Sequence, residues 1–239
     1  MPPLRIHLLR HGQGAHQLPP TEKNQYLPDP ALTEEGIAAC KAFRQNHPAS
    51  TLNPDLICAS PLRRTIQTAR YCFGDRFDSN GDGRDGGKTE RILLLPYAQE
   101  ATDLPSDTGS EQAVLEGEFG SLVDCGLLVG EDGEGGWRSS SGVYAPTHEA
   151  LRARAKGLRE WLAGREEGEV VVVGHGQFWH WVTGEVDGEG RQTSEFCAFP
   201  FIFFCVILGK SMLTIIFLSS AVLEQCRVAE LYFGDWTGW

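Results

Sequence analysis

The sequence predicts an α/β fold, in the form of a three-layer α/β/α sandwich with a mainly parallel sheet. Short apolar runs alternate along the chain with segments that carry helix-capping residues or apolar side chains at helical spacing. This alternation is typical of a parallel sheet with helices on both faces. The run from Glu169 to Val173 is continuous and β-branched, as expected for a central strand that is covered on both faces.

The predicted strands are short apolar runs beside turn-forming residues, at 4–9, 55–58, 91–95 and 169–173. The first predicted helix runs from its cap Thr33 to about His47, with two glutamates at its positive end. A second helix is expected to begin with Ser60 as the cap and a proline in the first turn. Two further helices are expected at 147–163 and 175–183.

Two loops are rich in glycine and polar or acidic residues, at 74–89 and 126–142. Residues 78–83 match the first half of a calcium-binding loop. The twelfth position of that pattern is Thr89 rather than the bidentate glutamate, which favours an ordinary solvated loop.

Charged residues follow the predicted strands, at the sheet edge where open α/β folds bind ligands. Arg10 and His11 directly follow the first strand, and His175 follows the last of the four. Arg63 and Arg64 lie in the first turn of the second helix, where cations are disfavoured unless an anion is bound. A single histidine after a strand would favour a structural role, but two of them with nearby arginines indicate a phosphate site.

Composition and charge restrict the class of partner. The net charge of −11 argues against broad binding to nucleic acid or an anionic membrane, so an anionic substrate needs a local positive cluster. The seven cysteines are scattered and lack a Cys-x-x-Cys pair, which favours reduced intracellular thiols over a disulfide framework or a zinc site. The first residues show no apolar leader, so we expect a cytoplasmic location. The length of 239 residues fits one large domain or two small ones.

Four motifs occur in a fixed order along the chain: Arg10-His11-Gly12, Leu32-Thr33-x-x-Gly36, Ser60-Pro61-Leu62-Arg63-Arg64-Thr65-x-x-Thr68-Ala69 and Val173-Gly174-His175-Gly176. Through them the sequence resembles the histidine phosphatase superfamily, the phosphoglycerate mutase-like group, over roughly residues 4–185. The stretches 10–16 and 100–109 resemble its fungal and plant phosphomutase-like branch. The resemblance implies a phosphoglycerate mutase-like fold in a single histidine phosphatase-like domain over 1–239, with an atypical apolar segment at 196–223.

The resemblance implies a histidine-type phosphomonoesterase that hydrolyses a small phosphorylated substrate through a phosphohistidine. His11 would be the nucleophile, because an imidazole attacks well near neutral pH when its other nitrogen is held as N–H. Glu100 would protonate the leaving oxygen and then activate water. Arg10, Arg63 and His175 would surround the phosphoryl oxygens, so no metal or other cofactor is expected.

Three further residues are expected to line the pocket and contact phosphate or substrate, namely Gln13, His16 and Gly176. Arg64 is expected to face the solvent. Asp103 and Asp107 could cap their loop or replace Glu100 as the catalytic carboxylate. A phosphoglycerate-type phosphomutase and a catalytically impaired phosphate-binding protein are the alternative functions. The sequence does not indicate the oligomeric state.

The apolar segment at 196–223 departs from the family pattern. It is long enough to span a bilayer, but Lys210 lies near its middle, and a proline and a glycine interrupt it. Residues 226–233 read like a last strand of the same sheet, which a bilayer crossing would not permit. Three interpretations stay open: buried strands or a helix packed on the domain, a membrane- or partner-binding element, and translated non-coding sequence.

Overall fold

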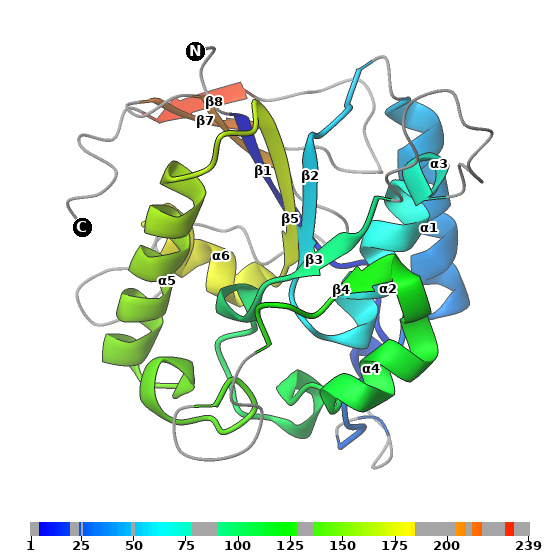
Figure 1. Cartoon of the computed structure of the whole chain (residues 1–239), viewed down its shortest axis with the longest axis vertical. Helices are drawn as coiled ribbons and strands as arrows, with labels where there is room; N and C mark the ends of the chain where they lie inside the picture. Colours follow the sequence, from blue (N-terminus) through cyan, green and yellow to red (C-terminus); the bar gives the residue numbers. More distant parts are fainter. Residues whose placement is uncertain are drawn as a thin grey trace.

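The computed structural model describes residues 5–19, 24, 26–48, 51–77, 90–128 and 136–184, and the strand segments 204–208, 212–216 and 228–231. The calcium-like pattern at 78–83 lies outside these residues. The described strands form one sheet in the order β4-β3-β2-β5-β1-β6-β7-β8 (Figure 1).

Five parallel strands form the part of the sheet that carries the candidate site. They are β4 (Val123–Asp124), β3 (Ile92–Leu94), β2 (Leu56–Ala59), β5 (Glu169–Gly174) and β1 (Arg5–Arg10). β5 lies between β2 and β1 and pairs in parallel with both. Because parallel strands end at the same edge, the residues that follow them gather on one side of the sheet.

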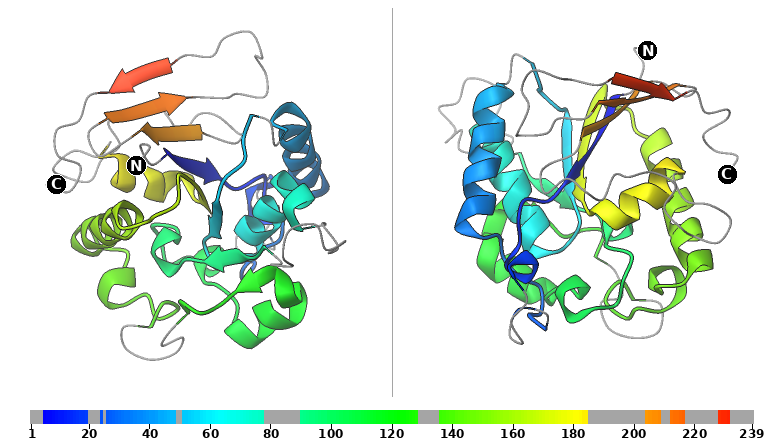
Figure 2. Two further views of the ribbon diagram at one scale, coloured as in Figure 1. Left: turned by 45° about the horizontal axis from the view of Figure 1, so that its top comes forward. Right: turned by 180° about the vertical axis from the view of Figure 1, so that it is seen from behind.

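Helices cover both faces of the sheet, with α1 and α2 on one face and α5 and α6 on the other (Figures 1 and 2). The helices are α1 (Glu34–Asn46), α2 (Arg63–Cys72), α3 (Gly74–Phe77), α4 (Gln112–Phe119), α5 (His148–Ala163) and α6 (Gly176–Thr183). Alternate residues of β5 supply two hydrophobic clusters. Val171 and Val173 pack with α1 and α2, whereas Val170 and Val172 pack with α5 and α6. The predicted three-layer α/β/α sandwich is confirmed.

The start of α1 is confirmed, but the predicted start of α2 is wrong. Thr33 caps α1 and accepts the backbone N–H of Gly36 at 3.0 Å. α2 begins at Arg63 rather than at Ser60, because Leu62 is still extended, with φ −112° and ψ 143°. Asp29, from the loop after β1, takes the capping role that the sequence assigned to Ser60, since its Oδ1 accepts the N–H of Arg63 at 2.8 Å.

Three antiparallel strands extend the sheet beyond β1. They are β6 (Phe204–Leu208), β7 (Met212–Ile216) and β8 (Val228–Leu231). β6 pairs with β1 opposite Arg5 to Leu9. The two described runs of the apolar segment are therefore sheet strands, as the first of the three interpretations expects, and the predicted last strand returns to the same sheet. The remainder of 196–223 lies outside the described residues.

Within the part of the chain that the structure describes, no helix has the length and apolar character that a bilayer span requires.

Candidate active site

His11 lies directly after β1, and one nitrogen of its buried ring is fixed. Its Nδ1 lies 2.7 Å from the backbone oxygen of Gly12. Because a carbonyl oxygen only accepts hydrogen bonds, Nδ1 carries the proton and Nε2 carries the lone pair. Gly12 is itself held in place, since its N–H donates to Thr68 Oγ1 at 3.0 Å. This is the tautomer that a nucleophilic imidazole needs.

His175 follows β5 and is fully buried, with its ring centroid 5.1 Å from that of His11. Its Nδ1 accepts from Arg64 Nη2 at 3.1 Å, since a guanidinium only donates. Its Nε2 then carries the proton and donates to Ser60 Oγ at 3.0 Å. Burial, reinforced by the charge of Arg64, lowers the pKa of both His11 and His175 well below the ordinary value, so both rings are neutral near pH 7.

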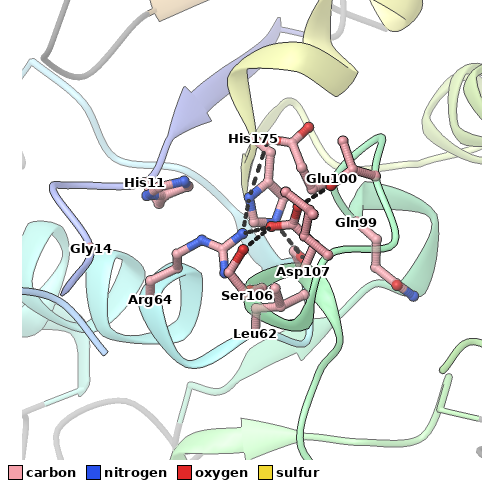
Figure 3. Close-up of polar contacts among 12 residues, drawn as sticks. His11, Gly14, Leu62, Arg64, Gln99, Glu100, Ser106, Asp107 and His175 are labelled. Carbon is pink, nitrogen blue, oxygen red and sulfur yellow. Dashed lines mark hydrogen bonds and ion pairs between the residues drawn. The ribbon is translucent and has the colours of Figure 1, made fainter. Parts of the chain in front are cut away.

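Arg64, from α2, lies at the centre of the cluster (Figure 3). Its Nη1 donates to the backbone oxygen of Ser106 at 2.5 Å, and its Nη2 donates to Asp107 Oδ1 at 2.8 Å as well as to His175. The side chain is 1% exposed, and among the described residues its Nε has no hydrogen-bond partner. A buried donor without a partner, beside two neutral imidazoles, is suited to bind an anion.

The two neighbouring arginines have the opposite of their expected placements. Arg64 was expected to face the solvent and is buried. Arg63 was expected at the phosphate, but its Nε donates to Glu118 Oε2 on α4 at 2.6 Å, and its side chain is 28% exposed. Adjacent residues of a helix point in different directions, and only Arg64 points toward the histidines.

Glu100 follows the 3₁₀ turn η2 (Pro96–Ala98) and lies beside His175 (Figure 3). Its Oε1 accepts the backbone N–H groups of Ala101 at 2.8 Å and Phe178 at 3.1 Å, and its Oε2 lies 3.9 Å from His175 Nδ1. Burial, aided by the negative charge of Asp107, raises the pKa of Glu100. A carboxyl that holds its proton longer is suited to protonate a leaving group.

His16, Arg10 and Gly176 lie close to this cluster. The ring centroid of His16 is 5.9 Å from that of His11, and burial together with Arg64 and Arg10 lowers the pKa of His16 to about 4. A Cβ atom on Gly176 would lie 3.3 Å from Cδ and Nε of Arg10, so the glycine leaves room for the arginine side chain. The structure thus brings these three predicted residues together with His11.

Gln13 lies elsewhere than expected. Its Oε1 accepts from Thr33 Oγ1 at 2.6 Å, and its backbone oxygen accepts the Thr33 N–H at 2.9 Å. The side chain therefore fastens the loop after β1 to the start of α1 instead of lining the pocket. The side-chain amide of Gln13 lies within hydrogen-bond distance of the Thr33 hydroxyl at the α1 cap. The sequence motif did not indicate this contact.

Besides Arg64, three residues of the cluster were not predicted as site residues, namely Ser60, Thr68 and Asp107. Ser60 and Thr68 are small hydroxyl residues within the motif at 60–69, and both are fully buried. Such buried hydroxyls need partners, so they provided a signal that the site was close. The sequence suggested Asp107 only as a loop cap or as a replacement for Glu100 as the catalytic carboxylate. It did not indicate the pairing of Asp107 with Arg64.

Histidines and a buried arginine at the carboxyl edge of a parallel sheet are features of an α/β protein that handles phosphate groups. Comparison with known proteins leads to the same class. The family model described as histidine phosphatase superfamily (branch 1) matches residues 6–76. A phosphoglycerate mutase-like protein of Arabidopsis thaliana is 26% identical over 199 residues, covering 73% of this chain and 72% of the relative.

A protein of Schizosaccharomyces pombe named as a probable phosphatase is 25% identical over 171 residues, covering 72% of this chain and 73% of the relative. The fold is similar to the crystal structure of the ecdysone phosphate phosphatase of Bombix mori in complex with tungstate, with a TM-score of 0.56, 17% identity and 98% of each chain covered. The predicted resemblance to the histidine phosphatase superfamily and to plant and fungal phosphoglycerate mutase-like proteins is confirmed.

Proposed function

We propose that this chain is a phosphatase that hydrolyses a small phosphomonoester through a phosphohistidine on His11. The observation that supports it most is the fixed tautomer of His11, whose Nδ1–H is held by the backbone oxygen of Gly12. In the proposed reaction Nε2 attacks phosphorus, and the bond from phosphorus to the ester oxygen breaks. Arg10 and the Nε–H of Arg64 stabilise the charge on the transferred group.

Glu100 moves the proton in both halves of the proposed reaction. Its carboxyl protonates the departing ester oxygen, which leaves as an alcohol. The resulting carboxylate then takes a proton from a water molecule as that water attacks the phosphohistidine. The P–N bond breaks, inorganic phosphate leaves, and His11 returns to its neutral form with Nδ1 still protonated.

In the proposed reaction, the protonation state of His175 depends on the charge of the bound substrate. In the structure His175 is neutral, with Nδ1 accepting from Arg64 and lying 3.9 Å from Glu100 Oε2. A phosphate dianion beside it favours the imidazolium form, because an opposite charge within a few ångström raises the pKa of a base. Protonation of Nδ1 then replaces the hydrogen bond from Arg64 with one to Glu100, and His175 adds positive charge at the stage when the transferred group needs it.

A trapped phosphoenzyme assay tests the nucleophile. The full chain is mixed with an aryl phosphate carrying labelled phosphorus, quenched in alkali, and mapped by peptide mass spectrometry. We expect an acid-labile label on His11 that is absent from His11→Ala and retained in His148→Ala, a control at an exposed histidine on α5. If the unaltered chain shows neither label nor phosphate release, the proposal is wrong.

The leaving group tests Glu100. Glu100→Gln should lower kcat for an alkyl phosphate by about 10²- to 10⁴-fold, because the alkoxide cannot leave without a proton. For a nitrophenyl phosphate, whose leaving group needs no proton, the loss of phosphoenzyme formation should be much smaller. Equal losses for both substrates would assign the proton to another group.

The relatives named as phosphoglycerate mutase-like make a mutase the second candidate. Interconversion of phosphoglycerates without net release of phosphate would establish it. Binding of inorganic phosphate without turnover of any ester would instead indicate a phosphate-binding protein.

We also infer a cytoplasmic location for this activity. Among the described residues Cys40, Cys58, Cys72 and Cys125 are free thiols, which suits a reducing compartment. Fractionation of cells that express the tagged full chain tests this, and recovery in a secreted or organellar fraction would contradict it.

A further inference from the structure

Asp107 is a carboxylate of the cluster to which the proposed reaction assigns no step. It ends the 3₁₀ turn η3 (Pro105–Asp107), and its side chain is 7% exposed. We propose that Asp107 is a positioning residue, which fixes the Arg64 guanidinium against His175 and thereby keeps the His175 ring in its Nε2–H form. This inference rests on the proposed function for its catalytic meaning, but its test does not.

Both oxygens of Asp107 are engaged, which makes it a rigid anchor (Figure 3). Oδ1 accepts from Arg64 Nη2 at 2.8 Å, and Oδ2 accepts from the hydroxyl of Thr102. The backbone oxygen of Ser106, the residue before it, accepts from Arg64 Nη1 at 2.5 Å. One turn of chain therefore holds both terminal nitrogens of the guanidinium and leaves its Nε–H without a partner among the described residues.

The same contact determines where the proton lies on His175. Because Asp107 holds Nη2 of Arg64, an N–H of that nitrogen points at Nδ1 of His175 at 3.1 Å. Nδ1 must accept, so the proton stays on Nε2, where it is donated to Ser60. Without the anchor, the backbone oxygen of Ser106 is the remaining acceptor described here that holds the guanidinium, and it contacts only the other terminal nitrogen.

Asp107 also acts on Glu100 through charge. The groups that favour ionised Glu100 come from five elements or their ends: Arg10 at the end of β1, Arg64 on α2, Ala101 after η2, Arg154 on α5 and Phe178 on α6. His175, at the end of β5, is neutral and lies 3.9 Å from Glu100 Oε2. Burial and the charge of Asp107 are the influences that raise the pKa of Glu100. Removal of that charge should let the cations lower it.

Asp107 is itself poorly suited to be the proton donor. Both of its oxygens already accept hydrogen bonds, one from the guanidinium of Arg64 and one from the hydroxyl of Thr102. Asp103 is exposed. It lies four residues away in the same loop, so Asp103→Asn is a control that removes one charge of the same kind.

The test uses the full chain and the variants Asp107→Asn, Asp107→Ala and Asp103→Asn. Asp107→Asn keeps an acceptor oxygen for Arg64 and removes only the charge, while Asp107→Ala removes both. The Glu100 carboxyl is titrated by NMR with ¹³C-labelled glutamate, assigned through Glu100→Gln. The tautomer of His175 is read from its ring ¹⁵N shifts. Neither measurement requires turnover.

We expect Asp107→Asn to lower the pKa of Glu100 by about half a unit or more, and Asp103→Asn to leave it unchanged. Asp107→Ala should also shift the His175 ring away from the Nε2–H form. If turnover occurs, the alkaline limb of the pH–rate profile moves to lower pH in Asp107→Asn, because the acid loses its proton earlier.

The inference is overturned if the His175 ring of Asp107→Ala keeps the Nε2–H form of the unaltered chain, or if the pKa of Glu100 in Asp107→Asn equals that in Asp103→Asn. Should Asp107→Ala fail to fold, the isosteric Asp107→Asn decides the question alone. Absence of a phosphoenzyme in the unaltered chain would reject the proposed function while leaving these two readouts intact, so the two failures are distinguishable.

Discussion

Arg63 and Arg64 are chemically identical neighbours with different environments, and helix geometry explains the difference. Residues one apart on a helix point about 100° from each other, so only one of the two can face the sheet. Arg64 shares its face with Thr68 and Cys72, four and eight residues on, and both are buried. Arg63 shares its face with Gln67, which is partly exposed. The helical period of the buried residues therefore identifies the arginine that enters the site.

Substitution of each arginine in turn tests this assignment. Arg64→Gln should lower kcat/KM for an aryl phosphate by about 100-fold or more, because a buried donor aimed at the transferred group is lost. Arg63→Gln should change it by less than about threefold, since that side chain pairs with Glu118 at the surface. Steady-state kinetics on both variants, with thermal unfolding as the check on folding, decides between them. Equal losses would contradict the assignment.

At the scale of elements, the start of α1 and the loop after β1 are fitted closely together. A Cβ atom on Gly36 would lie 2.3 Å from the backbone oxygen of Gln13, which is too close for any side chain. Gly117, in the middle of α4, has no heavy atom within 4 Å of its Cβ position. The two helical glycines thus differ in the space around them. Of the two, only Gly36 must lack a side chain for α1 to pack against the loop that follows β1.

We expect Gly36→Ala to lower the free energy of unfolding by about 1–3 kcal/mol, because the loop must move away from the helix. It should also reduce phosphoenzyme formation. Gly117→Ala should raise the free energy of unfolding by about 0.5–1 kcal/mol, since alanine is the better helix former at an exposed position. Urea titrations measure both. A neutral Gly36→Ala would show that the loop and helix are not in contact.

β1 carries His11 and is hydrogen-bonded on both sides. The N–H of Arg5 donates to Gly168 at 2.9 Å, and the N–H of His11 donates to Gly174 at 3.0 Å. Amides alternate in direction along a strand, so the odd-numbered residues of β1 donate toward β5 and the even-numbered ones toward β6. The apolar C-terminal segment therefore covers an edge that would otherwise be open.

Hydrogen exchange tests that pairing directly. The amides of Ile6 and Leu8, which face β6, should exchange as slowly as those of His7 and Leu9, which face β5. NMR exchange rates on the full chain measure all four in one experiment. If Ile6 and Leu8 exchange about 100-fold faster than their neighbours, β6 is not paired with β1.

The sequence predicted the elements that have strong local signals. Four of the five parallel strands and the helices α1, α5 and α6 were foreseen within a residue or two, because apolar runs and caps mark them. α4 and β4 were not, since α4 contains Gly117 and buries only Leu115 and Phe119, and β4 has two residues. In the site, His11, His175 and Glu100 followed from strand ends.

The directions of individual side chains could not be read in the same way. Gln13 turned to the cap of α1 and Arg63 to α4, because each found a partner far along the chain. A motif fixes the order of residue types, whereas the partner of each polar group depends on which distant segment lies beside it. For the same reason, the pairing of Asp107 with Arg64 could not be predicted from the sequence.

At the scale of the whole molecule, the fold lowers the pKa of four of the described histidines. Burial is the first cause that lowers the pKa of His7, His11, His16 and His175, and arginines add to the effect in each case. An unfolded chain takes up protons on these rings below about pH 6.5, whereas the folded chain takes them up only at lower pH. The free energy of unfolding should therefore depend on pH in the range where histidine titrates.

The sign of that dependence follows from proton counting. Between pH 6.5 and about 4, the folded value for His16, the unfolded state binds more protons on histidine, so stability falls as the pH falls. Each such proton contributes a slope of about 1.4 kcal/mol per pH unit. The raised pKa values of Glu100 and Asp29 act in the opposite sense, because the folded state then holds the extra proton. Four histidines outnumber two carboxyls, so the net change on acidification is a loss.

We therefore expect the urea midpoint of unfolding to fall from pH 7.5 to pH 5. His16→Gln should lessen the fall, because one of the rings that resists protonation is removed. His148→Gln should leave the fall unchanged, since that side chain is exposed. A midpoint that stays constant over this range, or a fall as large in His16→Gln as in the unaltered chain, would mean that the site histidines accept protons freely in the folded protein. The neutral nucleophile that the proposed reaction requires would then be lost in mildly acidic solution.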